Sequence, residues 1–198
     1  MSDPLRLPNE SFTYADYLEW EGPERYEIIN GEAFMMASPT VEHQAIITEL
    51  LFQLANFLRG KPCQVFTAPL DVRLFPAKDH SDDTVVQPDI LVVCDKSKLS
   101  KGSVDGPPDL VIEILSPSNT YKLMFLKFES YLNAGVREYW VLDPEEKKAQ
   151  VNVLHEGRYI SSACKKDAVI HASVLPPFSV DLASLWGGTP QAPQGSDA

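Results

Sequence analysis

Two short apolar runs in the middle of the chain each carry one carboxylate. Residues 90–93 (ILVV) are typical of a buried β-strand and follow Asp89, while residues 110–115 (LVIEIL) form a similar run with Glu113 inside it. A charged carboxylate in an apolar strand is unfavourable unless a partner, a proton or a metal ion stabilises it. The two runs therefore indicate an acidic site built into the core of a sheet.

Spacing along the strands indicates which acids can converge. Residues on one strand are about 3.3 Å apart, so Asp109 and Glu113 lie roughly 13 Å apart along the backbone. Neighbouring strands are about 4.8 Å apart, so Asp89 and Glu113 can meet across two strands. An alternative stays open, in which Asp89 caps a strand entrance and Glu113 pairs with a lysine or arginine.

A lysine on the next helix is the third candidate. Residues 116–120 (SPSNT) offer several helix N-caps, and the helix is expected to run to about Ala134, with Gly135 ending it. Lys127 falls within the apolar stripe of this helix. Its ammonium can point toward the strand that carries Glu113, or its stem can lie on the core while the ammonium reaches water.

The segments PDILVVCD, GPPDLVIEILSPSN and KFESYLNAGVREYWVLDP closely resemble the bacterial putative restriction endonuclease family of the PD-(D/E)XK nuclease superfamily. The resemblance covers residues 12–185 and implies hydrolysis of phosphodiester bonds, most simply in DNA. Leu115 stands where the superfamily pattern has its lysine, and in this family that lysine looks relocated to the following helix, which matches Lys127. Leu123 stands where family members tend to carry an acid.

The resemblance also implies the composition of a metal site. Asp89 and Glu113 are the expected ligands, and the backbone carbonyl of Ile114 is the third. Such an oxygen-rich set suits Mg²⁺ or Mn²⁺. Lys127 would orient the attacking water or stabilise charge on the phosphate.

Three further residues have two interpretations each. His43 lies close to the apolar stripe of the first long helix, where it is either a hydrogen-bonded core residue or, as the resemblance implies, part of the site, at its outer wall or at a second metal position. Glu27 and Glu32 flank a predicted hairpin turn at residues 30–31 (NG). Both are solvent-facing strand acids, or one of them is an outer member of the site.

The order of predicted elements indicates one α/β domain over residues 12–186. It has a restriction-endonuclease-like core (αβββαβ), a mixed central sheet flanked by helices, and an added N-terminal β-hairpin. A flexible N-terminus is predicted for residues 1–11 and a disordered tail for residues 187–198.

The formal net charge of −11 is unusual for a protein that binds nucleic acid. Lys96, Lys98 and Lys101 lie in the link between the two acidic strands, as a solvated loop or as a first contact with phosphate. The main alternative function is a catalytically inactive binding or assembly module on a nuclease fold.

Cysteine usage and hydropathy bear on location. Cys63, Cys94 and Cys164 show neither zinc-site spacing nor a disulfide framework, and Cys94 is predicted to be an inert core thiol. No apolar run approaches the roughly 20 residues of a membrane span. We expect a cytoplasmic protein without membrane contact, and a homodimer, because cutting a duplex requires two active centres.

Overall fold

The structure of the protein is a computed structural model that describes residues 11–116 and 119–186. The predicted tail (187–198) and all but the last residue of the predicted flexible N-terminus (1–11) lie outside these ranges. So do two residues of the predicted capping segment, 117 and 118.

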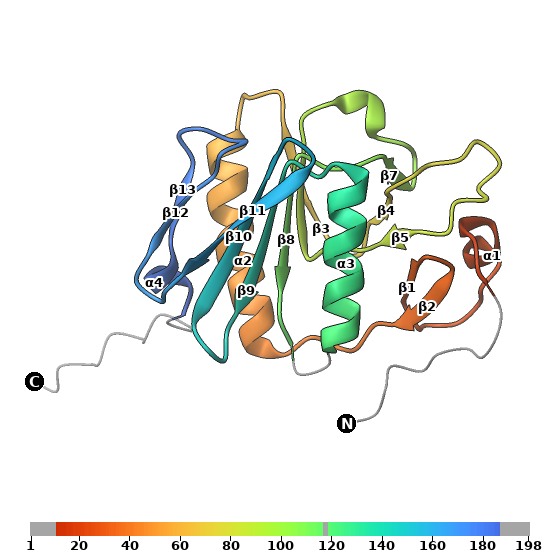
Figure 1. The fold of residues 1–198 in the computed structure, drawn as a ribbon, viewed down its shortest axis with the longest axis horizontal. Helices are drawn as coiled ribbons and strands as arrows, with labels where there is room; N and C mark the ends of the chain where they lie inside the picture. The colour runs from red at the N-terminus through yellow and green to blue at the C-terminus, as the bar shows by residue number, and fades with distance from the viewer. Residues whose placement is uncertain (1–10, 117–118, 187–198) are drawn as a thin grey trace, which may run out of the picture.

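A six-stranded mixed sheet forms the centre of the fold (Figure 1). Its strand order is β11-β10-β9-β8-β6-β3. Only β8 and β9 pair in parallel, because the chain crosses between them through a helix. The strands are β3 (Gln64–Thr67), β6 (Ile90–Val93), β8 (Leu110–Ile114), β9 (Glu138–Asp143), β10 (Lys148–His155) and β11 (Arg158–Cys164).

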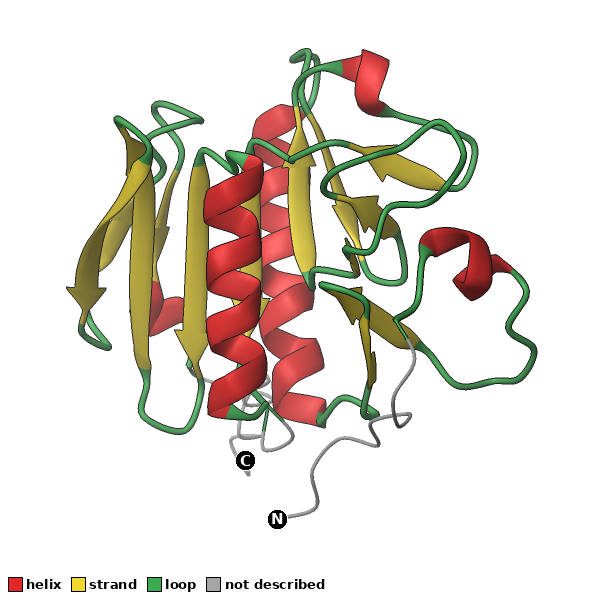
Figure 2. Cartoon of the chain, turned by 45° about the vertical axis from the view of Figure 1, so that its right-hand side comes forward, coloured by secondary structure: helices red, strands yellow, loops and turns green. Residues whose placement is uncertain are grey.

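Two long helices pack on opposite faces of this sheet (Figure 2). Alternate residues of β6 point to opposite faces, so Ile90 and Val92 pack with α2 (Val41–Leu58), whereas Leu91 and Val93 lie in the cluster of α3 (Tyr121–Ala134). The order α2, β3, β6, β8, α3, β9 confirms the predicted αβββαβ core.

The ends of α3 follow from local sequence. The Thr120 side chain accepts a hydrogen bond from the backbone N–H of Leu123 and so caps the first turn. Gly135 ends the helix with a φ of 86°, a left-handed conformation that favours glycine. These two signals fix the position of Lys127 along the helix.

A second sheet, of five strands, has the order β2-β1-β5-β4-β7. It begins with the predicted hairpin, whose turn residues Asn30 and Gly31 have φ values of 52° and 76°. Its apolar residues join the same core cluster as α3, so this sheet covers the α3 side of the central sheet. The strands are β1 (Tyr26–Ile29), β2 (Glu32–Met35), β4 (Asp71–Arg73), β5 (Val85–Val86) and β7 (Ser103–Asp105), preceded by α1 (Tyr14–Leu18).

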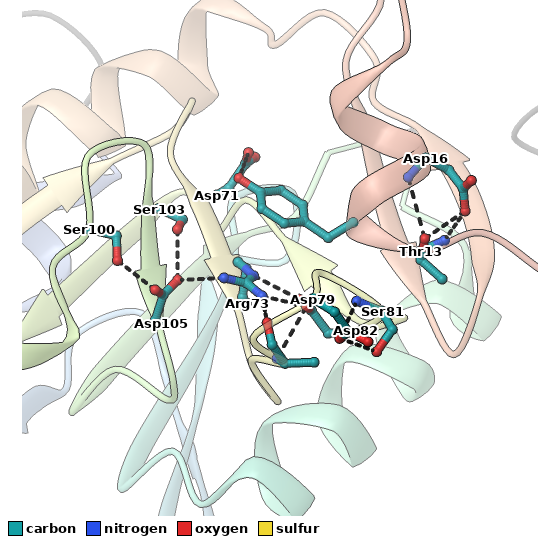
Figure 3. A network of polar contacts seen from close by, with 12 residues as sticks. Thr13, Asp16, Asp71, Arg73, Asp79, Ser81, Asp82, Ser100, Ser103 and Asp105 are labelled. Carbon is teal, nitrogen blue, oxygen red and sulfur yellow. Dashed lines mark hydrogen bonds and ion pairs between the residues drawn. The ribbon is translucent and has the colours of Figure 1, made fainter.

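A buried arginine holds the loops of the second sheet together (Figure 3). Arg73 Nε donates to Asp82 Oδ2 at 2.9 Å, and Arg73 Nη1 lies 3.3 Å from Asp105 Oδ1. The Asp82 side chain is fully buried, so this ion pair joins the loop before β5 to the sheet.

The sequence pattern predicts no helix or strand for residues 165–186. This segment forms a two-stranded sheet, β12 (Val169–His171) with β13 (Ser179–Asp181), followed by α4 (Leu182–Leu185). Its apolar residues belong to the core cluster of α2, so the segment closes that side of the molecule.

The prediction that the cysteines form no disulfide is wrong. Cys63 directly precedes β3, Cys94 directly follows β6, and the antiparallel register pairs Gln64 with Val93. The two cysteines are therefore opposite each other, and they form a disulfide with an S–S distance of 2.08 Å. Cys94 is thus not an inert core thiol, and only Cys164 is a free cysteine within the described ranges.

Candidate active site

The pairing of β6 with β8 brings the two predicted acids together. Ile90 pairs with Ile112 in an antiparallel register, so Asp89 and Glu113 are opposite each other one residue beyond this pair. Asp89 Oδ2 accepts a hydrogen bond of 2.8 Å from the backbone N–H of Ile114. The acid at the start of one strand is thereby held at the end of the other.

Lys127 lies between two buried carboxylates. Its Nζ is 2.8 Å from Glu113 Oε1 and 2.9 Å from Glu27 Oε1. The three side chains are only 4%, 6% and 3% exposed, respectively, so the lysine does not extend to water. The helix supplies the cation, and each of the two larger sheets supplies one anion.

The charge states of this triad differ from those in water. Burial raises the pKa of Glu113 to about 7, although the charge of Lys127 acts to lower it. Burial alone would lower the pKa of Lys127, but the charges of Glu113 and Glu27 outweigh it and raise the pKa above its ordinary value. Lys127 therefore stays protonated, while Glu113 titrates close to neutral pH.

His43 contacts the other acid of the pair. It lies in the first turn of α2, and its Nε2 is 3.2 Å from Asp89 Oδ2. Burial would lower the pKa of His43, but its hydrogen bond to Asp89 and the charge of Asp89 raise the pKa above the ordinary value, helped by the backbone of Ile114. The residue is both buried and part of the wall of the site.

The carboxylates keep oxygens available for a metal ion. Within the described ranges, each of these acids accepts hydrogen bonds on one oxygen only, and its second oxygen accepts none. The oxygens that accept are Asp89 Oδ2, Glu113 Oε1 and Glu27 Oε1. In the same ranges, no group of three or more His, Cys, Asp or Glu side chains is arranged to hold a metal. Two carboxylates with a backbone carbonyl still fit Mg²⁺, which retains several waters and takes few protein ligands.

Two residues that the sequence did not single out for the site position its carboxylates. Tyr131 donates from its hydroxyl to Glu113 Oε1 at 2.6 Å, and the backbone N–H of Gln87 donates to Glu27 Oε1 at 2.8 Å. Tyr131 lies four residues after Lys127 and therefore on the same helical face. This spacing is the sequence feature that could have indicated its contact with Glu113. Gln87 precedes the Pro-Asp dipeptide, and nothing in its local pattern indicated a contact with Glu27.

The remaining candidates lie away from this cluster. Glu32 pairs instead with Lys122, at 2.8 Å from Nζ to Oε1. Lys96, Lys98 and Lys101 lie in and after the short helix η1 (Lys96–Lys98), at the ends of β6 and β8 opposite to Asp89 and Glu113. A phosphate bound by these lysines would be separated from the acids by the length of β6.

The chain is similar to known proteins over most of its length. The family Uma2, described as putative restriction endonuclease, matches residues 14–183. An uncharacterized protein of Synechocystis sp., slr1290, is 28% identical over 129 residues, which are 64% of this chain. The match spans 65% of the length of that relative.

No described helix is long and apolar enough to cross a membrane.

A solved structure from Anabaena variabilis, described as a putative nuclease belonging to DUF820, is similar with a TM-score of 0.71. The similarity covers 88% of this chain and 97% of that chain at 22% sequence identity. It shows that the two proteins share a fold.

Proposed function

Because the chain belongs to the putative restriction endonuclease family, we propose that it is a metal-dependent nuclease that hydrolyses phosphodiester bonds of DNA. Family and fold both support a nuclease function. The observation that carries the proposal is the buried Lys127, which lies against Glu113 with Asp89 opposite on the neighbouring strand. Acids on neighbouring strands can hold a metal ion that activates water, and a nearby ammonium can stabilise charge on the phosphate.

Each residue has a distinct role in this proposal. Asp89, Glu113 and the carbonyl of Ile114 would hold Mg²⁺ or Mn²⁺, which when bound polarises a phosphoryl oxygen and supplies a stronger nucleophile at neutral pH. Lys127 would stabilise negative charge as it develops on the phosphate, from a helix rather than from the strand position that Leu115 fills. His43 would hold Asp89 in place, and Tyr131 would hold Glu113.

The negative net charge of the chain is compatible with this role. Lys127 lies between Glu113 and Glu27, and Asp89 is opposite Glu113 on the neighbouring strand. When ionised, these three acids outnumber the one ammonium, which favours binding of a divalent cation. A bound cation would then reverse the local field that a phosphate meets. The homodimer and the cytoplasmic location remain predictions.

Magnesium should stabilise the wild-type protein and not Asp89→Asn. At ten times the dissociation constant, binding to the folded state adds about 1.4 kcal/mol to the free energy of unfolding. For a domain of this size we expect a rise in Tm of roughly 3–6 °C, measured by differential scanning fluorimetry. Asp167→Asn, at an exposed acid in a turn, should keep the wild-type shift.

An inactive binding module is the second candidate, favoured by Leu123 at the position where relatives tend to carry an acid. Cleavage assays with Mg²⁺ and Mn²⁺ on single-stranded and duplex DNA separate the two functions. A wild-type protein that shows no metal-induced rise in Tm and cuts none of these substrates would contradict the nuclease proposal.

A further inference from the structure

A groove of about 1180 Å³ begins beside the candidate active site. Its lining includes Leu115, which follows Ile114, and Glu42, which precedes His43. It continues along α3 over β9 and β10, where Phe128 and Val141 contribute to its walls. The groove therefore meets the site at the end of β8 and at the first turn of α2, while Asp89, Glu113 and Lys127 are not among its described lining residues.

Two exposed aromatic rings form one wall of the groove. Tyr121 is 91% exposed and Phe125 is 55% exposed. They are four residues apart on α3 and so lie on one face of the helix. Exposed neighbouring apolar side chains in a groove mark a binding surface, and flat rings stack on nucleobases of any sequence.

The charges of the groove restrict what can occupy it. Lys148 is its one basic lining residue among the described ones, against the acids Glu42, Asp143 and Glu145. Duplex DNA carries one negative charge per 1.7 Å or so and is bound mainly through lysine and arginine. Stacking on a base needs no cation, so the lining favours a ligand held by its base rather than by its phosphates.

A buried hydroxyl offers a polar contact in the same place. Tyr139 lines the groove, and its hydroxyl has no hydrogen-bond partner among the described residues although it is buried. A buried donor without a partner is unfavourable, so an acceptor that reaches it is bound more tightly. The carbonyl oxygen of a nucleobase is such an acceptor.

We propose that this groove binds the base of an unpaired nucleotide and directs the protein to single-stranded or locally unpaired nucleic acid. The inference rests on the proposed nuclease function and names its substrate class. The base stacks on Tyr121 and Phe125, and Tyr139 donates to its polar edge.

The test is binding of labelled single-stranded DNA and RNA 12-mers and of a hairpin duplex to the full chain, by fluorescence anisotropy in EDTA. Single strands should bind at least about tenfold more tightly than the duplex. Tyr121→Ala and Phe125→Ala should each weaken single-strand binding roughly 5- to 150-fold, and Tyr121→Phe should restore it. The DNA and RNA arms identify the sugar that the groove accepts.

Two controls separate binding from folding. Phe52→Ala removes a 64% exposed ring on α2 outside the groove and should leave binding unchanged. Tyr139→Phe should weaken binding while Tm is maintained or rises, because it removes only a hydroxyl that has no hydrogen-bond partner in the described part of the chain. Few phosphate contacts also predict a weak salt dependence, with a slope near −0.7 for each phosphate neutralised.

The outcomes distinguish this inference from the proposed function. If duplex bound as tightly as single strands, or if Tyr121→Ala and Phe125→Ala kept wild-type affinity, the groove would not be the binding site for an unpaired base, even if the protein cuts DNA. Loss of single-strand binding in these variants supports the groove even if no substrate is cut. A change in oligomeric state of Phe125→Ala, seen by sedimentation, would instead assign the groove to a second copy of the chain.

Discussion

Lys127→Met should destabilise the metal-free protein by about 3–5 kcal/mol and abolish cleavage, because it leaves Glu27 and Glu113 buried without a cation. From the helix position alone, methionine would preserve the fold, since it keeps the packing of the lysine stem. The two short ion pairs change that expectation. Urea denaturation in EDTA measures the loss of stability.

Lys122→Met is the matched control on the same helix. Lys122 pairs with Glu32, but its side chain is 55% exposed, so its removal should change stability by at most about 1 kcal/mol and leave cleavage intact. Adding Glu27→Gln to Lys127→Met should recover part of the lost stability without restoring cleavage. If Lys127→Met were as stable and as active as the wild type, the ion triad would have no part in folding or catalysis.

The metal-free protein should lose stability as pH rises from about 4.5 to about 7. The pKa of Glu113 is raised from 4.5 to about 7 in the folded state, so the folded state binds the proton more tightly than the unfolded state. The resulting stabilisation is complete below pH 4.5 and is lost as the pH passes 7. A difference of this size corresponds to about 3 kcal/mol, at about 1.36 kcal/mol per pH unit.

Glu113→Gln isolates this contribution from the other titrating groups. The variant cannot ionise, so its free energy of unfolding should exceed that of the wild type increasingly between pH 4.5 and pH 7.5, measured by urea denaturation in EDTA. The exposed Glu146→Gln should follow the wild-type profile. Parallel pH profiles of Glu113→Gln and the wild type would show that Glu113 is ionised throughout this range.

The part of the site that strand geometry determines was predictable from the sequence. Asp89 precedes one apolar run and Glu113 lies inside the other, so the two acids can meet if these strands are neighbours, as they are in the structure. Lys127 lies in a helical stripe with capping signals on both sides. The contact of Glu27 with Lys127 was less accessible, because it depends on how a second sheet packs against α3. The sequence pattern gave no reason to prefer Glu27 over Glu32 as a member of the site.

The missed features all depend on pairing between distant segments. The Cys63–Cys94 disulfide requires the register of β3 against β6, which no cysteine spacing reveals. The strands β12 and β13 have three residues each, too short for an alternating pattern to stand out from a loop. The lysines between β6 and β8 were near the acids in sequence, but the link returns at the far end of both strands.

The position of Lys127 has a consequence for how the site comes into existence. One ammonium is shared by an acid from the N-terminal hairpin and an acid from the central sheet, while the lysine itself belongs to the crossover helix between β8 and β9. The cluster therefore forms only when the hairpin, the central sheet and the crossover helix have packed together. Neither half of the chain could carry it alone, and a partly folded protein would hold its acids apart, without the charge density that attracts a divalent cation.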